Sequence, residues 1–302
     1  MTTSEAVPRQ VAPSETAAPE TLLRARNLVK EFTVSGNGLL GRSGRFRAVD
    51  DVSLEVRKGE TLALVGESGS GKSTTARLIA RLIDTTSGTI EFDGREVHAL
   101  TGKGLHSFRS EVQMVFQDPY SSLNPKHTVE RIVTAPLAYQ RRPIPGGARA
   151  FTRALLDRVG LDPDHATRFP AQFSGGQAQR IGIARALAVS PKLIIADEAV
   201  SALDVSVQAQ VINLLRRLQD EEGFSYLFIA HDLAVVRQIA TRVAVMNGGR
   251  IVETGDRDSV FGAPQDDYTK KLLAAVPRIR PEWDAARRRN EQARREREGT
   301  EL

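Results

Sequence analysis

Residues 66–74 combine the residue types that can hold a phosphate group. They fit the pattern G-x-x-x-x-G-K-[ST], in which glycines let backbone N–H groups converge on phosphates and the following helix adds positive potential. Lys72 is expected to reach the β and γ phosphates of ATP, and Ser73 to offer its hydroxyl to Mg²⁺. The alternative, a glycine-rich turn that binds nothing, is disfavoured by the strand and helix patterns on either side. The predicted ATP-binding residues here are Gly66, Ser68, Gly69, Ser70, Gly71, Lys72, Ser73 and Thr74.

Two adjacent acids follow the apolar run 193–196. In proteins that carry the motif of residues 66–74, here called the P-loop, the first acid after such a strand holds Mg²⁺ through its waters. This predicts that role for Asp197. Glu198 is the candidate general base that polarises the attacking water, a role typically worth roughly 10²–10⁴-fold in rate. Two solvated acids at a strand end are common in isolation, but the P-loop makes that alternative the weaker one.

These residues need a sheet that brings them together, and the apolar pattern predicts one. Short apolar runs at 61–65, 193–196, 226–230 and 243–246 lie next to helical patterns, which is typical of a buried parallel sheet in an α/β protein. Residues 22–60 predict an antiparallel β subdomain with a Gly-rich connection at 35–45, and 247–249 predicts a hairpin turn.

The chain divides into three predicted segments. Residues 1–21 are rich in Pro, Ala, Ser, Thr and Glu, which predicts a disordered tail, and 22–262 form the main domain. Within that domain, helical patterns interrupted by prolines predict an inserted helical subdomain at about 123–178. Residues 263–302 form a C-terminal extension, whose charged segment 283–298 is better explained as a solvated helix than as a lipid or partner contact.

Composition excludes several classes of function. With 40% hydrophobic residues the chain can bury a core, and 42 basic against 37 acidic residues give a net charge of +5, too mild to require nucleic acid. The absence of cysteine excludes disulfides and iron–sulfur clusters. No apolar run is long enough to span a bilayer and residues 1–21 lack a signal-peptide pattern, so we expect any membrane association to be peripheral.

A third motif decides between families. Residues 173–177, here called the signature segment, place a Ser hydroxyl and glycine amides before a helical run, where they would meet one anion. Together with the P-loop, the two acids, Gln117 and His231, the signature segment resembles the ATP-binding domain of ABC transporters over residues 22–255. The resemblance implies a P-loop NTPase fold with a RecA-like core.

The resemblance also implies roles for the remaining motif residues. In that family two ATPase domains pair head to tail, so each signature segment contacts the γ-phosphate on the partner's P-loop. Gln117 then touches Mg²⁺ or the water and reports to the membrane subunits, His231 contacts the γ-phosphate, and 201–204 crosses the dimer interface. Adenine stacks on an aromatic residue late in the first strand, for which Phe32 is the candidate and Phe46 the alternative. The implied residues on the partner side are Ser174, Gly175, Gly176, Gln177 and Asp204.

Longer sequence segments point to a subfamily of these ATPases. Residues 117–125 and 197–210 closely resemble the oligopeptide/dipeptide importer ATPases, the insertion at 38–42 resembles their F subunit, and 268–273 resembles their C-terminal element. Three departures stand out. Asp266 and Asp267 replace the usual His-Pro, Ala178 replaces a basic residue, and the cysteines that ligate an iron–sulfur cluster in some relatives are absent.

The expected function is an ATPase subunit that uses ATP and Mg²⁺ to energise a peptide importer at the cytoplasmic face of the cell membrane. Its expected partners are a second ATPase subunit, two membrane permease subunits and an extracytoplasmic peptide-binding protein. Alternatives are an importer of nickel or glutathione, a soluble ABC ATPase acting on DNA or ribosomes, and a non-hydrolysing regulatory subunit. The intact Glu198, His231 and signature segment argue against the last. The solute, and whether the partner ATPase is a copy or a different chain, stay open.

Overall fold

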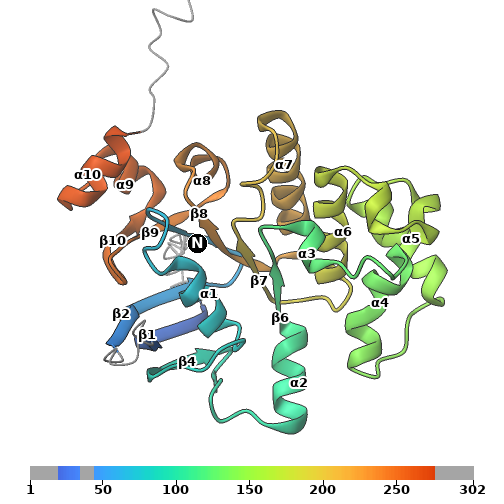
Figure 1. Cartoon of the computed structure of the whole chain (residues 1–302), viewed down its shortest axis with the longest axis horizontal. Helices are drawn as coiled ribbons and strands as arrows, with labels where there is room; N and C mark the ends of the chain where they lie inside the picture. The colour runs from blue at the N-terminus through green and yellow to red at the C-terminus, as the bar shows by residue number, and fades with distance from the viewer. Residues whose placement is uncertain (1–19, 35–43, 276–302) are drawn as a thin grey trace, which may run out of the picture.

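The computed structural model describes residues 20–34 and 44–275 (Figure 1). The predicted N-terminal tail up to residue 19, the 38–42 insertion and the charged 283–298 helix lie outside these residues. Among the helices that are described, none is both long and apolar enough to cross a bilayer.

A six-stranded, mostly parallel sheet forms the centre of the molecule. Five of its strands pair with one another in parallel. The sixth, 250–256, follows the predicted hairpin turn and pairs with the strand 242–247 in antiparallel orientation. This confirms the predicted α/β class. The sequence did not predict the strand 112–115, which pairs with the strand that ends at Asp197, because it is short and one of its four residues is the polar Gln113. In spatial order the strands are β10 (Arg250–Asp256), β9 (Arg242–Asn247), β3 (Thr61–Val65), β8 (Ser225–Ala230), β7 (Leu193–Asp197) and β6 (Val112–Val115).

Alternating side chains of this sheet enter two separate cores, because successive residues of a strand point to opposite faces. In β8, Tyr226 and Phe228 belong to one core and Leu227 and Ile229 to the other. All of β8 is buried, as expected for a strand covered on both faces. Helices cover the face that contains Tyr226 and Phe228. An antiparallel sheet and the helix 72–79 cover the face that contains Leu227 and Ile229.

The second sheet is antiparallel, with the order β2 (Gly44–Arg57), β1 (Thr21–Val34), β4 (Ser87–Phe92) and β5 (Arg95–Glu96). Helix α1 (Lys72–Ile79) buries Ala76, Leu78 and Ile79 in the core shared by the two sheets. The helical pattern that follows the 61–65 run extends from residue 72 to residue 82, so the sequence predicts a longer α1. It ends earlier because Arg81 has a left-handed backbone (φ +51°) and donates hydrogen bonds to the carbonyls of Val97 and Leu100.

The remaining helices lie around the central sheet. One group follows β6 and forms the lobe at the right of Figure 1, so the predicted helical insertion falls between β6 and β7; its exact bounds stay a prediction. This lobe contains α3 (Pro119–Ser122), α4 (Val129–Tyr139), α5 (Ala148–Arg158), two 3-10 turns (Pro163–Thr167 and Pro170–Gln172) and α6 (Gly175–Leu187). Elsewhere lie α2 (Gly102–Glu111), α7 (Val205–Glu222), α8 (Leu233–Ile239), α9 (Arg257–Gly262) and α10 (Asp267–Ala274).

Candidate functional site

The parallel strands bring four predicted segments to one edge of the central sheet. Val65, the last residue of β3, pairs with Ala230 of β8, and Asp197 of β7 pairs with Ile229. Val115 of β6 pairs with Ala196 of β7. Since carboxyl ends of parallel strands share an edge, the P-loop, the two acids, the segment of Gln117 and His231 all leave the sheet on the same side.

Two P-loop glycines are required by close backbone contacts. A Cβ added to Gly66 would lie 2.1 Å from the carbonyl oxygen of Met246. Gly71 precedes α1 with φ +105°, and a Cβ there would lie 2.4 Å from the carbonyl oxygen of Ala48. Only glycine fits either position, and the loop is thereby pressed against β9 and β2 at the N-terminus of α1.

Two buried charged groups lie at the base of the loop. The Lys72 Nζ donates to the carbonyl oxygens of Gly66 (2.8 Å) and Glu67 (2.7 Å), and burial lowers its pKa. The Ser73 Oγ donates to the Asp197 Oδ1 at 2.7 Å, and burial raises the pKa of Asp197. A hydroxyl and a carboxylate oxygen side by side are a donor set that Mg²⁺ accepts.

Glu198 and His231 meet beside this pair. The Glu198 Oε2 lies 3.4 Å from the His231 Nδ1, and the side chains are 16% and 53% exposed. The Glu198 backbone has φ +48°, and its N–H donates to the carbonyl oxygen of Ile229 at 3.0 Å. A left-handed backbone is uncommon for a residue other than glycine and occurs often at functional sites.

A hollow of about 400 Å³, here called the P-loop hollow, opens above these residues. Within the described chain the Ser70 hydroxyl is buried and has no hydrogen-bond partner, and Ser70 is not among the residues that line the hollow. The hydroxyls, glycine amides and lysine of the lining fit a phosphate group, and Phe46 adds an aromatic face. The hollow is lined by Phe46, Ala48, Ser68, Gly69, Gly71, Lys72, Ser73, Thr74, Gln117 and Glu198.

The aromatic candidates lie in different places. Phe32 of β1 and Phe46 of β2 are direct cross-strand partners, and both rings are exposed. Phe46 lines the P-loop hollow, whereas Phe32 is not among the residues that line it and has the Lys30 ammonium over its ring at 5.2 Å. The geometry therefore favours Phe46, which the sequence offered as the alternative.

The signature segment forms a second cluster outside the P-loop hollow. Ser174 begins α6 with a capping box, in which its Oγ accepts from the Gln177 N–H and the Gln177 Oε1 accepts from the Ser174 N–H. A Cβ added to Gly176 would lie 2.3 Å from Val207, so the segment packs closely on the start of α7. Asp204 is the exposed N-cap residue of α7, and Gly175 lies near Leu203.

Two polar contacts, which sequence reasoning missed, connect this cluster to the segment of Gln117. The Gln179 Nε2 donates to the carbonyl oxygen of Phe116 at 3.3 Å, and the Tyr120 Oη donates to the carbonyl oxygen of Phe173 at 2.7 Å. No local sequence pattern at Gln179 or Tyr120 predicts these contacts, which depend on how the segments pack. Ala178, which the sequence analysis names as a departure from the family pattern that this chain resembles, is completely buried.

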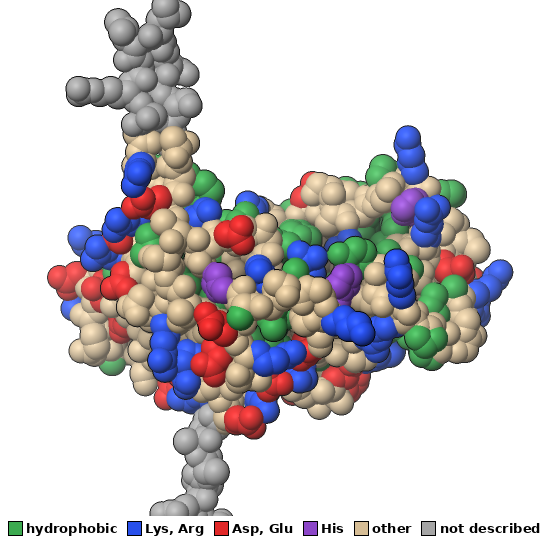
Figure 2. Space-filling model, turned by 90° about the horizontal axis from the view of Figure 1, so that it is seen from below, with side chains coloured by type: hydrophobic (Ala, Val, Ile, Leu, Met, Phe, Trp, Pro, Cys, Tyr) green, Lys and Arg blue, Asp and Glu red, His purple; other side chains and the backbone are tan. Residues whose placement is uncertain are grey.

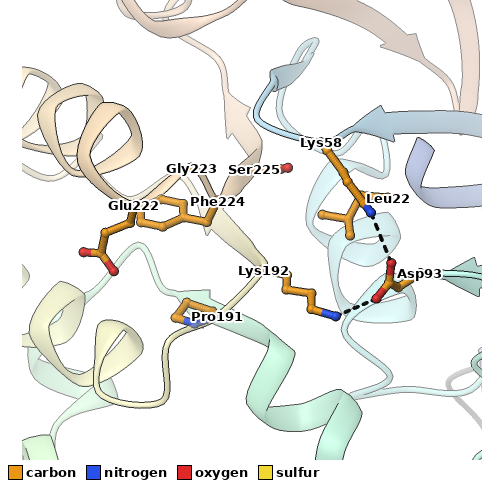
Figure 3. A pocket seen from close by; sticks show the side chains of 9 residues that line it. All are labelled: Leu22, Lys58, Asp93, Pro191, Lys192, Glu222, Gly223, Phe224 and Ser225. Carbon is orange, nitrogen blue, oxygen red and sulfur yellow. Dashed lines mark hydrogen bonds and ion pairs between the residues drawn. The ribbon is translucent and has the colours of Figure 1, made fainter. Parts of the chain in front are cut away.

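Another hollow, of about 260 Å³, lies at the opposite edge of the sheet, near the amino ends of β3, β7 and β8 (Figure 3). Asp93 lies between two lysines there, 2.5 Å from the Lys192 Nζ and 3.7 Å from the Lys58 Nζ. Lys58, Asp93 and Lys192 thus pair with one another, and Glu222 pairs with Arg158 outside the hollow. None of the predicted site residues lines this hollow.

Two family models match the chain. Residues 49–201 match the family described as ABC transporter, and residues 252–300 match the family described as oligopeptide/dipeptide transporter, C-terminal region. The two matches follow one another along the chain, so the second begins within β10 and includes α9 and α10.

Curated relatives and solved structures agree with these matches. The glutathione import ATP-binding protein GsiA of Pectobacterium atrosepticum is 50% identical over 287 residues, which cover 95% of this chain and 45% of the relative. GsiA of Escherichia coli K12 is 54% identical over 264 residues, covering 87% and 42%. The chain therefore spans less than half the length of these relatives.

Among solved structures, the dimeric post-hydrolysis state of the ATP-binding cassette MJ0796, bound to ADP and Pi, superposes with a TM-score of 0.68 at 30% identity. That superposition covers 78% of this chain and 99% of the neighbour. The protein cbiO1 from Clostridium perfringens, part of the ABC transporter complex cbiONQ, gives a TM-score of 0.68 at 26% identity and covers 86% and 97%.

Proposed function

Because the chain belongs to the ABC transporter family and carries the C-terminal region of oligopeptide/dipeptide transporters, we propose that it binds and hydrolyses ATP to energise a peptide-class importer. The observation that supports this most directly is the pairing at one sheet edge of Ser73 with Asp197 and of Glu198 with His231. The first pair offers oxygen ligands, and the second places a carboxylate and an imidazole where a reacting water can be activated.

For ATP binding, we assign the phosphates to the P-loop amides and to Lys72. The ammonium is already desolvated and held by two loop carbonyls, so it exchanges these partners for phosphate oxygens with little further loss of water. Ser73, Asp197 and Gln117 would hold Mg²⁺, which neutralises phosphate charge when bound. Phe46, in place of Phe32, is assigned to stack on adenine.

For hydrolysis, Glu198 is the general base that accepts the proton of the attacking water. His231 contacts the Glu198 carboxylate and is assigned to the γ-phosphate. The second half of each site comes from another ATPase domain, whose residues matching Ser174, Gly175, Gly176, Gln177 and Asp204 close over the nucleotide. Closure and reopening of this pair would drive the membrane subunits.

The remaining components are part of the same proposal. We propose that the chain works at the cytoplasmic face of the membrane with a second ATPase, two permease subunits and an extracytoplasmic binding protein. The two named relatives import glutathione, a peptide-class solute, and glutathione or other short peptides are the solutes we favour. The ATPase does not contact the solute, since selection takes place in the other subunits.

The test is ATP hydrolysis by the purified chain, with and without partner subunits, compared with its Glu198→Gln variant. Loss of the base is expected to lower the rate by at least about 10²-fold, while affinity for a fluorescent ATP analogue is retained. Glu96→Gln, which changes an exposed glutamate of the antiparallel sheet, is the matched control and should hydrolyse ATP normally. Undiminished turnover in Glu198→Gln would remove the assigned base, and a wild-type chain that neither binds nor hydrolyses ATP would refute the proposed function.

A further inference from the structure

Helix α10, in the C-terminal region, reaches back to the P-loop. The hydroxyl of Tyr268 accepts a hydrogen bond from the backbone N–H of Glu67 at 3.1 Å, a contact between residues 201 positions apart in the sequence. Resting on the proposed function, in which residues 66–74 hold ATP, we propose that Tyr268 is a positioning residue of the P-loop. The C-terminal region thereby takes part in nucleotide binding without touching the nucleotide.

The effect of this bond follows from the peptide units that it fixes. The N–H of Glu67 donates to Tyr268, and the carbonyl oxygen of the same residue accepts from the Lys72 Nζ at 2.7 Å. Tyr268 therefore fixes the backbone of the loop at Glu67, ahead of the amides that are proposed to hold the phosphates. A loop that is already ordered loses less conformational entropy when its ligand binds.

Tyr268 is itself held firmly. Its ring packs against the core of the central sheet. The Asp266 Oδ1 accepts from the backbone N–H groups of Tyr268 (2.8 Å) and Thr269 (3.4 Å) and so caps α10. This cap fixes the start of α10 directly before Tyr268.

The loop before α10 is fastened to the central sheet as well. The carboxylate of Glu253, on β10, accepts from the backbone N–H groups of Gln265 (2.9 Å) and Asp266 (3.1 Å). Hydrogen bonds to a charged acceptor are stronger than those between neutral groups. A continuous series of contacts thus runs from β10 through Glu253, Asp266 and Tyr268 to the P-loop.

The decisive variant is Tyr268→Phe, which keeps the packed ring and removes only the hydroxyl. We expect the Kd for a fluorescent ATP analogue and the KM for ATP to rise by roughly 2- to 10-fold, the factor that one hydrogen bond supplies. The kcat at saturating ATP should stay within about twofold of wild type, because the bond orders the free loop and contacts no reacting atom. A purely structural role would instead lower the melting temperature and leave the affinity of the folded fraction unchanged.

Tyr139→Phe is the matched control, because it removes a tyrosine hydroxyl that accepts from Arg109 on the exposed surface. Asp266→Ala removes the cap of α10 without changing Tyr268 and should weaken binding in the same direction. Wild-type affinity in Tyr268→Phe would overturn the inference whatever the result for Asp266→Ala, as would an equal loss in Tyr139→Phe. Failure of the wild-type chain to bind the analogue would instead refute the proposed function, so the two failures are distinguishable.

Discussion

At the scale of single residues, the site keeps charges where burial disfavours them. Burial lowers the pKa of Lys72 and raises the pKa of Asp197, so each environment favours the neutral form of its side chain. Both groups lie at the base of the loop that is proposed to hold the phosphates. We infer that the free chain gives up stability to keep charged groups ready for ATP and Mg²⁺.

Asp197→Asn tests this cost. The carboxyl has a raised pKa in the folded chain, so its contribution favours folding below its ordinary pKa of 3.8 and is lost as the pH rises through the raised value. The amide does not titrate. The variant without nucleotide should therefore melt at a higher temperature than wild type at pH 8, and the difference should shrink as the pH is lowered toward 3.8. Its affinity for Mg·ATP should fall, because one oxygen ligand loses its charge.

Scanning fluorimetry at several pH values, with and without Mg·ATP, measures both effects. Asp84→Asn, which changes an exposed carboxyl, is the control and should show neither. A variant that is less stable than wild type at every pH would mean that the Asp197 charge contributes to folding instead of opposing it.

The sequence motifs predicted that P-loop residues and Glu198 lie together at the P-loop hollow, because each motif is a short continuous segment whose spacing can be recognised without knowing the fold. They favoured Phe32 over Phe46 as the adenine-stacking residue, whereas Phe46 is the one that lines the hollow. The two residues are cross-strand partners, and which of them reaches the hollow depends on the pairing of β1 with β2. The contact of Tyr268 with Glu67 is also beyond sequence reasoning, since it depends on the packing of α10.

At the scale of elements, buried strands were the easiest to predict, because both of their faces are apolar. β3, β7, β8 and β9 contain the predicted runs, whereas β6 has only four residues, one of them the polar Gln113, and was missed. Helix ends were harder. The end of α1 is set by the hydrogen bonds of Arg81 to residues 16 and 19 positions later, which no local signal indicates.

The contact of α3 with α6 leads to a prediction of its own. The Tyr120 Oη donates to the carbonyl oxygen of Phe173, the residue before Ser174, and so joins the segment of Gln117 to the start of the signature helix. Tyr120→Phe should lower the kcat of the assembled ATPase by roughly 2- to 10-fold, which corresponds to one lost hydrogen bond of about 0.5–1.5 kcal/mol. Nucleotide affinity of the isolated chain should not change, because Tyr120 does not line the P-loop hollow.

Steady-state kinetics and a fluorescent ATP analogue separate these two quantities. Tyr139→Phe is again the control, and it should match wild type in both. If Tyr120→Phe weakened nucleotide binding and left kcat intact, the tyrosine would act on the P-loop side, and the proposed link to the signature segment would be wrong.

At the scale of the whole molecule, the motif residues divide into two clusters. The P-loop hollow gathers residues from β2, α1 and the ends of β6 and β7, whereas Ser174 and Asp204 begin α6 and α7 and do not line it. Beside Asp204 lies Val205, a hydrophobic side chain that is 82% exposed. Acidic and basic side chains are interspersed on the face shown in Figure 2, in keeping with a net charge of only +5.

This division makes the proposed head-to-tail pairing testable by complementation. Lys72→Ala removes the phosphate ligand of one chain, and Ser174→Arg blocks an exposed residue of the signature segment, so each variant alone should be inactive. In a mixed dimer, the intact P-loop of one variant faces the intact signature segment of the other. Mixing equal amounts should restore up to about a quarter of the wild-type rate, because half of randomly paired dimers are mixed and each has one complete site.

The concentration dependence supplies the second half of this argument. Because the complete site forms only in a dimer, the rate per chain should rise with protein concentration in the wild type and in the mixture, but in neither variant by itself. If the wild-type chain pairs only with a different ATPase, the same experiment applies with Lys72→Ala in this chain and the signature change in its partner. Two inactive variants that stay inactive when mixed, beside a wild-type rate per chain that is independent of concentration, would mean that each chain completes its own site.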